Sequence, residues 1–284
     1  MKDPVGPRSG AVAEIALLDL RSTPVVTKVF SYDPFPMSVG PVVIVVAMSL
    51  LVSAPTCAPS AVVFLHGLAD TGDGLQSFIG GRSDPGGFSS SMAKAGIKVL
   101  FPTATPRSYR LAGGRTMSTW YDRNGLPPEA PEHAESIEDS ITKLEGVLRQ
   151  LESEGIPPSR VAVGGFSQGG GIALQLAYRG SQLGASLAAV FALSSFATDD
   201  SAMWASLEGD GSKRARPPCY FRHGAEDDYI LPEWAQRTAG RLGKAGVDVD
   251  FALERGVRHE MSNDELKALT AFLLQTVSED LDQG

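Results

Sequence analysis

The feature that most restricts the fold of this chain is a glycine-bounded segment, Gly165-Phe166-Ser167-Gln168-Gly169. It follows an apolar run at residues 161–165 and precedes a helix-like segment at residues 169–178. A serine at a sharp strand-to-helix turn stands exposed, and the crowded backbone leaves little room for side chains on the flanking residues. This context predicts that Ser167 is a nucleophile and disfavours a glycine-rich turn with an incidental serine.

The chain from residue 60 onward alternates strand-like and helix-like segments. Apolar runs predict strands at residues 61–65, 97–101, 161–165, 187–193, 219–222 and 247–253. Helical spacing of apolar residues predicts helices at 132–154, 169–178, 233–244 and from Ser262 onward, where Ser262 and Glu265 have the spacing of a capping box. A loop of about thirty residues is expected after Phe101. This order predicts an α/β-hydrolase fold: a mainly parallel central sheet with helices on both faces.

The general base follows by elimination among the four histidines. In this fold the nucleophile precedes the acid, and the acid precedes the histidine. Only His223 and His259 lie beyond Ser167, and the acids nearest to His223 follow it. His259 lies between the last predicted strand and the last predicted helix, where a loop returns to the carboxyl edge of the sheet. We therefore expect His259 to take the proton from Ser167, and a surface histidine is the alternative.

Several carboxylates lie between Ser167 and His259. Asp227 and Asp228 follow a predicted strand through a short turn, which is where a carboxylate can reach the histidine ring. Two adjacent residues rarely point at one imidazole, so one of them is expected to be a turn residue. We take Asp227 as the triad acid and keep Asp228 as the alternative.

Acyl transfer also needs two N–H donors directed at the developing oxyanion. One is expected from the Gln168 backbone, directly after the nucleophile. The other is expected from Leu68, in the loop that follows the first predicted strand. His66 then has a structural role, which is to brace that loop from the interior.

Composition narrows the range of partners. The formal net charge of −8, with no cluster of Lys or Arg, argues against a nucleic-acid partner and against electrostatic docking on an anionic membrane. The two cysteines, Cys57 and Cys219, form neither a disulfide framework nor a zinc site. No metal-ligand spacing and no phosphate loop is present, so we expect no cofactor and no metal.

Residues 1–59 differ in composition from the rest. Prolines are frequent there, so we expect an N-terminal extension followed by one catalytic domain at residues 60–284. Residues 42–52 (VVIVVAMSLLV) are almost wholly apolar but far shorter than the roughly 20 residues that cross a bilayer. They are interpreted as a strand or mobile arm of a cytoplasmic protein. The alternative is a targeting or anchoring segment of a secretory or membrane-associated protein.

The chain resembles the acyl-protein thioesterases, also called the lysophospholipase or phospholipase/carboxylesterase family. The motifs that carry the resemblance run from about residue 60 to 275: FLHGLADTGDG, FPTATPR, GGRTMSTWYD, ESIEDS, GIPPSRVAVGGFSQGG, HGAEDD and GVRH. By motif, the resemblance implies a triad of Ser167, Asp227 and His259. Residues 1–59 look additional to the family pattern, and the segment between His223 and Pro232 is one residue longer than usual.

The resemblance implies hydrolysis of fatty-acyl thioesters on S-acylated proteins, with a lysophospholipase or a small-molecule carboxylesterase as the alternative. Acyl lipids are then alternative substrates, transient contact with a membrane surface is expected, and the protein is expected to be a monomer or a weak homodimer. An apolar wall for the acyl chain is expected from Leu75, Met117 and Trp120, although packing of the loop onto the core explains Trp120 equally well.

Overall fold

The computed structural model describes residues 59–81, 84–209 and 216–278. A six-stranded sheet has the order β2-β1-β5-β6-β7-β8, and every neighbouring pair is parallel. The strands are β1 (Ala61–Leu65), β2 (Lys98–Leu100), β5 (Val161–Phe166), β6 (Ala189–Leu193), β7 (Cys219–Gly224) and β8 (Val249–Glu254). Because the strands are parallel, the loops after β1, β5, β6, β7 and β8 meet at one edge of the sheet.

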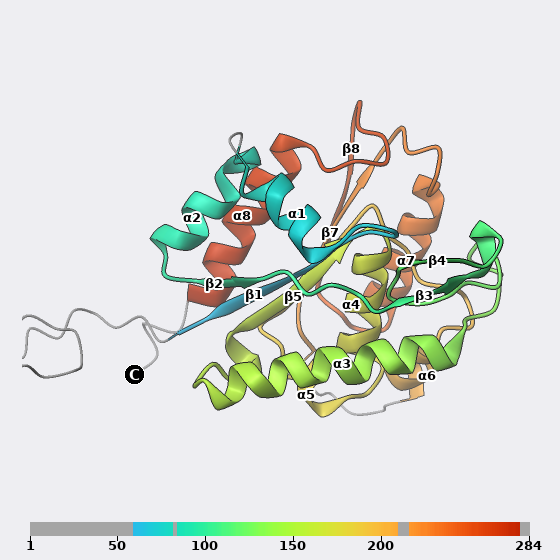
Figure 1. Cartoon of the computed structure of the whole chain (residues 1–284), viewed down its shortest axis with the longest axis horizontal. Coiled ribbons are helices and arrows are strands. Elements are labelled where there is room, and N and C mark those ends of the chain that lie inside the picture. Colours follow the sequence, from blue (N-terminus) through green and yellow to red (C-terminus); the bar gives the residue numbers. More distant parts are fainter. Residues whose placement is uncertain (1–58, 82–83, 210–215, 279–284) are drawn as a thin grey trace, which may run out of the picture. The chain divides into compact units, whose positions relative to one another are not determined.

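Helices cover both faces of this sheet (Figure 1). One apolar cluster joins the sheet to α1 (Gly72–Ile79), α2 (Phe88–Lys94) and α8 (Asn263–Ser278). The other joins it to α3 (Ala134–Ser153), α4 (Gln168–Tyr178), α6 (Ala202–Gly209) and α7 (Pro232–Lys244), while α5 (Gln182–Ala185) is a short helix after α4. Val62 and Phe64 of β1 belong to the first cluster, and Val63 belongs to the second, as the two-residue strand period requires. The predicted α/β-hydrolase fold is confirmed.

Several segments differ from the sequence prediction, which included none of the short helices α1, α2, α5 and α6. The expected loop after Phe101 contains an antiparallel hairpin, β3 (Pro106–Tyr109) and β4 (Arg115–Ser118). Its strands are polar and largely exposed, so they lack the apolar alternation that identifies a strand. The polar region around Asp199 and Asp200 continues into α6, a helix too short to show a clear apolar period in the sequence.

The predicted capping box at the start of α8 forms only in half. The Ser262 hydroxyl accepts a hydrogen bond of 3.0 Å from the Glu265 N–H, as predicted. The Glu265 side chain is fully buried, and neither carboxylate oxygen has a hydrogen-bond partner among the described residues. Burial raises the pKa of this carboxyl to about 8, so it is largely neutral at pH 7. Glu265 is thus a core residue, and the Ser262 N–H lowers its pKa without forming a hydrogen bond of standard length and angle.

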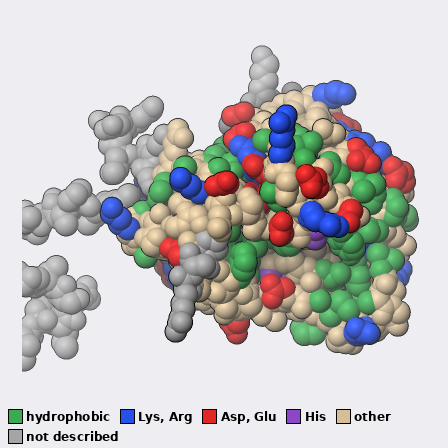
Figure 2. Space-filling model, turned by 90° about the horizontal axis from the view of Figure 1, so that it is seen from above, with side chains coloured by type: hydrophobic (Ala, Val, Ile, Leu, Met, Phe, Trp, Pro, Cys, Tyr) green, Lys and Arg blue, Asp and Glu red, His purple; other side chains and the backbone are tan. Residues whose placement is uncertain are grey.

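The described surface carries charges of both signs. Figure 2 shows acidic and basic side chains interspersed among hydrophobic ones on the face seen from above. No helix among the described residues is long and apolar enough to cross a membrane. The apolar segment at residues 42–52 and the proposed boundary at residue 59 lie at or outside the start of the described residues, so both interpretations stay predictions.

Candidate active site

Ser167 occupies the sharp turn between β5 and α4. Its backbone has φ 53° and ψ −119°, a strained conformation for a residue with a side chain, and its N–H donates a 2.8 Å hydrogen bond to the Leu193 carbonyl of β6. A Cβ atom on Gly165 would lie 2.4 Å from the Leu65 carbonyl oxygen, and one on Gly169 would lie 2.3 Å from the same atom. Glycine is therefore required on both sides of Ser167 by the close approach of β1.

His259 brings its ring to Ser167 from the loop after β8. Its Nε2 lies 3.0 Å from the Ser167 hydroxyl, and its Nδ1 lies 2.7 Å from a carboxylate oxygen of Asp227. The ring centroid lies 4.9 Å from that of Phe166 and 5.1 Å from that of Tyr229, so aromatic groups restrict the ring on two sides. The three residues predicted from the sequence therefore meet in one hydrogen-bonded chain.

The structure separates the two candidate acids. Asp227 is buried, and its second oxygen accepts hydrogen bonds from the Tyr229 N–H at 3.0 Å and the Ile230 N–H at 2.9 Å. The Asp228 side chain is 66% exposed and forms an ion pair with Arg258. Asp227 therefore contacts His259, whereas Asp228 faces solvent.

Asp227 is held in its ionised form. Burial by itself raises the pKa of this carboxyl, but hydrogen bonds from His223, His259 and the Ile230 N–H outweigh it, so the net pKa lies well below the ordinary value. An ionised acid at this position keeps a proton on Nδ1 of His259, which leaves Nε2 free to accept one from Ser167.

His223 is an additional residue of the site that sequence reasoning did not assign. It is fully buried, its Nε2–H donates to the Ile230 carbonyl at 2.8 Å, and the same nitrogen lies 3.3 Å from the Asp227 carboxylate. It thus contacts the same carboxylate oxygen of Asp227 as His259 does. Its location at the end of β7, four residues before Asp227, is the only signal that the sequence offered.

Leu68 and Gln168 lie where the oxyanion donors were expected. Both line the same pocket as Ser167, and among the hydrogen bonds of the described residues neither backbone N–H acts as a donor. The N-terminus of α4 adds partial positive charge at this point. Two unpaired N–H groups beside a candidate nucleophile are what a developing oxyanion requires.

Side chains behind the pocket hold these two backbone segments. The buried Gln168 amide accepts from the Thr119 hydroxyl at 2.7 Å and from the Trp120 N–H at 2.9 Å, and it donates to the Tyr121 carbonyl at 2.7 Å. The buried His66 ring accepts from the Ala104 N–H at 3.0 Å and lies 2.7 Å from the Gly67 carbonyl. His66 therefore braces the loop that carries Leu68, in agreement with its expected structural role.

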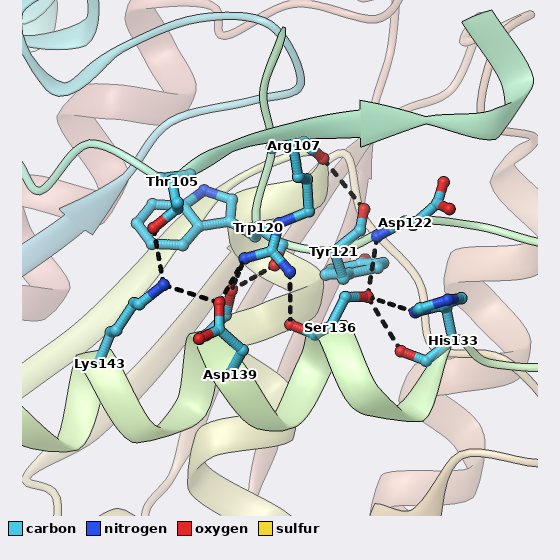
Figure 3. Close-up of polar contacts among 12 residues, drawn as sticks. Thr105, Arg107, Trp120, Tyr121, Asp122, His133, Ser136, Asp139 and Lys143 are labelled. Atoms are coloured by element: carbon cyan, nitrogen blue, oxygen red, sulfur yellow. Dashed lines mark hydrogen bonds and ion pairs between the residues drawn. The ribbon is translucent and has the colours of Figure 1, made fainter. Parts of the chain in front are cut away.

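The segment after β4 is docked on the first turns of α3 (Figure 3). The Asp122 N–H donates to the Ser136 hydroxyl at 3.0 Å, and the Trp120 carbonyl accepts from the Ser140 hydroxyl. Arg107 of β3 pairs with Asp139 of α3 at 2.7 Å. These contacts give residues 119–123 a fixed place beside α4.

The expected apolar wall differs from the observed one. Leu75 is 2% exposed and packs in the core between α1 and the sheet, and Trp120 is 3% exposed with its indole N–H bonded to the His66 carbonyl at 2.9 Å. Met117 is half-buried on β4. None of the three lines the pocket beside Ser167, because the fold directs Leu75 and Trp120 inward. This corrects the substrate assignment.

Ser167 lines a pocket together with residues of several loops. Its walls come from six separate segments, and most of the lining residues were not predicted from the sequence. Besides Leu68, Ser167 and Gln168, the lining residues are Tyr109, Arg123, Leu126, Ser194, Ser195, Phe196, Tyr229 and Ile230. The walls are thus apolar and polar in similar measure, and they include one guanidinium. No group of three or more potential metal ligands occurs among the described residues.

Comparison with known proteins identifies the family. A model of the phospholipase/carboxylesterase family matches residues 48–277. The chain belongs to the phospholipase/carboxylesterase family. Mouse lysophospholipase-like protein 1 is 33% identical over 224 residues, which cover 78% of this chain and 90% of the mouse protein. Acyl-protein thioesterase 1 homolog 1 of Dictyostelium discoideum is 27% identical over 222 residues, or 77% of this chain and 91% of that protein.

Solved structures agree with this family assignment. The crystal structure of Arabidopsis thaliana SOBER1 superposes with a TM-score of 0.66 at 25% identity and covers 78% of this chain and all of its own. The Zea mays acyl-protein thioesterase 2 structure has the same fold, with a TM-score of 0.65 at 24% identity over 77% of this chain and 94% of its own. This member of the phospholipase/carboxylesterase family is therefore an enzyme, a serine hydrolase.

Proposed function

We propose that this enzyme cleaves acyl thioesters and esters through a covalent intermediate on Ser167, with His259 as the base and Asp227 as the acid that orients it. The single observation that carries the proposal is the continuous chain of contacts, 3.0 Å from Ser167 to His259 and 2.7 Å from His259 to Asp227. The two unpaired N–H groups of Leu68 and Gln168 support the same reaction.

The chemistry follows from these positions. His259 accepts the hydroxyl proton as the Ser167 oxygen attacks the acyl carbonyl, and the two N–H groups stabilise the oxyanion. Collapse of the intermediate breaks the bond to the thiolate or alkoxide, which takes the proton from His259. Water then attacks the acyl-serine by the same route and releases the carboxylic acid. Ionised Asp227 stabilises the imidazolium formed in each half of the reaction.

We further propose S-acylated proteins as the substrates, because the Dictyostelium relative is named an acyl-protein thioesterase. The exposed rim of the site supports access by a protein. Tyr229, whose ring lies 5.1 Å from that of His259, is 49% exposed. A thioester on a flexible peptide can then approach Ser167 without entering a deep channel.

The polar part of the pocket wall favours a second candidate, hydrolysis of small esters or lysophospholipids with short acyl groups. Arg123, Ser194 and Ser195 line the pocket beside Ser167, and a long alkyl chain gains little from contact with such groups. The name of the mouse relative, lysophospholipase-like protein 1, is consistent with this candidate.

Labelling with a fluorophosphonate probe tests the nucleophile. Wild-type protein is expected to be labelled, Ser167→Ala is expected to lose labelling, and kcat is expected to fall at least ~10³-fold in Ser167→Ala and His259→Ala. Ser153→Ala, at the exposed end of α3, is the matched control and should retain both properties. Undiminished labelling of Ser167→Ala would overturn the mechanism.

Paired substrates test the substrate class. Release of palmitate from an S-palmitoylated peptide is compared with release of butyrate from the butyrylated peptide and from matched oxyesters. Higher kcat/KM for the palmitoyl thioester supports the first candidate. A steep preference for butyryl groups, or for oxyester over thioester, rejects it in favour of the second.

A further inference from the structure

Arg123 is a buried cation in the wall of the candidate active site. The residue is 8% exposed, and it lines both the pocket around Ser167 and a neighbouring pocket. Its guanidinium lies between two aromatic rings, 5.0 Å from the centroid of Tyr121 and 4.6 Å from that of Phe196. The mechanism proposed above makes no use of this group.

The guanidinium has few partners for a buried group. One nitrogen, Nη2, donates to the Tyr121 hydroxyl at 2.9 Å, while Nε and Nη1 have no hydrogen-bond partner among the described residues and are not fully enclosed by protein. A guanidinium offers five N–H donors, and removing its charge from water is costly unless an anion or further acceptors compensate. The two aromatic faces supply only part of that compensation.

The nearest carboxylates in the chain are engaged elsewhere. Asp122, the preceding residue, pairs with Arg110 at 3.0 Å. Glu132, which forms an isolated backbone bridge with Arg123, directs its carboxylate to Gln175 and toward Arg179. Within the described ranges, no carboxylate forms an ion pair with Arg123.

The position of Arg123 is fixed and close to the reacting centre. The segment that carries it is bound to Gln168, the residue after the nucleophile, through the Tyr121 carbonyl at 2.7 Å, and to α3 through Asp122 at 3.0 Å (Figure 3). Because Ser167 and Arg123 line the same pocket, a substrate bound at Ser167 can place one of its groups against the guanidinium.

We propose that Arg123 is a specificity-determining residue that binds an oxyanion group of the substrate, a carboxylate or a phosphate, a few bonds from the scissile carbonyl. This inference rests on the proposed hydrolysis at Ser167 and adds the chemical class of the substrate. A planar guanidinium with free N–H groups matches a carboxylate or phosphate in geometry as well as in charge. Substrates of this kind are acyl groups that end in a carboxylate, or esters whose alcohol carries a phosphate.

Two pairs of substrates distinguish the sources of the anion. S-glutaryl-N-acetylcysteamine is compared with its neutral methyl ester, and 1-butyryl-glycerol 3-phosphate is compared with 1-butyrylglycerol. The wild-type enzyme is expected to have at least tenfold higher kcat/KM for the anionic member of one pair, mainly through a lower KM. The pair that shows the preference identifies the side of the scissile bond that faces Arg123.

Variants of Arg123 test its role against a purely structural one. In Arg123→Gln the ratio of kcat/KM for the anionic substrate to that for the neutral one should fall at least tenfold. Arg123→Lys should restore part of this ratio, because lysine returns the positive charge but not the planar guanidinium. Equal loss on anionic and neutral substrates, or no preference in the wild type for either pair, would overturn the inference. Fluorophosphonate labelling of Ser167 is measured in parallel, so failure of the nucleophile assignment is seen separately from failure at Arg123.

Discussion

Replacement of Glu265 by Gln is expected to stabilise the protein, increasingly so as pH rises. The wild-type carboxyl is fully buried with no hydrogen-bond partner among the described residues, and burial raises its pKa from 4.5 to about 8. The Ser262 N–H and Arg222 lower the pKa in part, while the carboxylate of Glu254 raises it further. Gln has nearly the shape of the neutral acid and cannot ionise.

The magnitude follows from the two pKa values. Between pH 4.5 and 8 the unfolded chain releases the Glu265 proton and the folded chain keeps it, so stability falls as pH rises, by about 1.4 kcal/mol per pH unit. The group therefore favours folding most below pH 4.5, and this contribution is lost as pH approaches 8. Relative to the wild type, Glu265→Gln should gain less than about 1 kcal/mol at pH 5, about 3 kcal/mol at pH 7 and about 4 kcal/mol at pH 8.

Urea unfolding at pH 5 and pH 8 measures this difference. The free energy of unfolding falls by roughly 2–3 kcal/mol per molar urea for a protein of this size. The urea midpoint of Glu265→Gln should therefore lie more than about 1 M above that of the wild type at pH 8 and only slightly above it at pH 5. Glu152→Gln, the same change on the exposed face of α3, is the matched control and should leave the midpoint unchanged at both pH values. If the urea midpoint of Glu265→Gln differed from that of the wild type by the same amount at pH 5 and at pH 8, the reasoning would be refuted.

Three further predictions concern the site. Asp227→Asn should lower kcat about 10⁴-fold in a steady-state assay by favouring the wrong tautomer of the histidine, whereas Asp228→Asn should change it less than about threefold; the reverse order would exchange their roles. Gly169→Ala should destabilise the protein by about 1–3 kcal/mol in thermal unfolding, because its Cβ would lie 2.3 Å from a backbone oxygen. Gly146→Ala in α3, where nothing lies within 4 Å, should stabilise it by about 0.5–1 kcal/mol, and equal effects would contradict the steric argument. Gln168→Ala should lower kcat/KM at least tenfold, because residues 119–121 lose their hydrogen bonds to the Gln168 side chain. Unchanged kinetics would show that these hydrogen bonds are not needed to position the segment.

Much of the fold and part of the site were readable from the sequence because their causes are local. Strand and helix periods identify the parallel sheet and its helices. The sharp turn at Ser167 needs glycine two residues before and two residues after it, and chain order leaves His259 as the base. The polar hairpin β3–β4 was missed because its strands have no apolar alternation. The helices α1, α2, α5 and α6 were missed because four to eight residues are too few to show a helical period clearly.

The sequence by itself determined which serine and histidine stand at the sheet edge, because short-range sterics and chain order suffice for that. Only tertiary structure decided which aspartate faces His259, since Asp227 and Asp228 differ in direction and not in local sequence. It also turned Leu75 into the core, brought Arg123 beside Ser167, and left the Glu265 carboxyl without a partner. These outcomes depend on contacts between segments far apart in the chain, which no local pattern encodes.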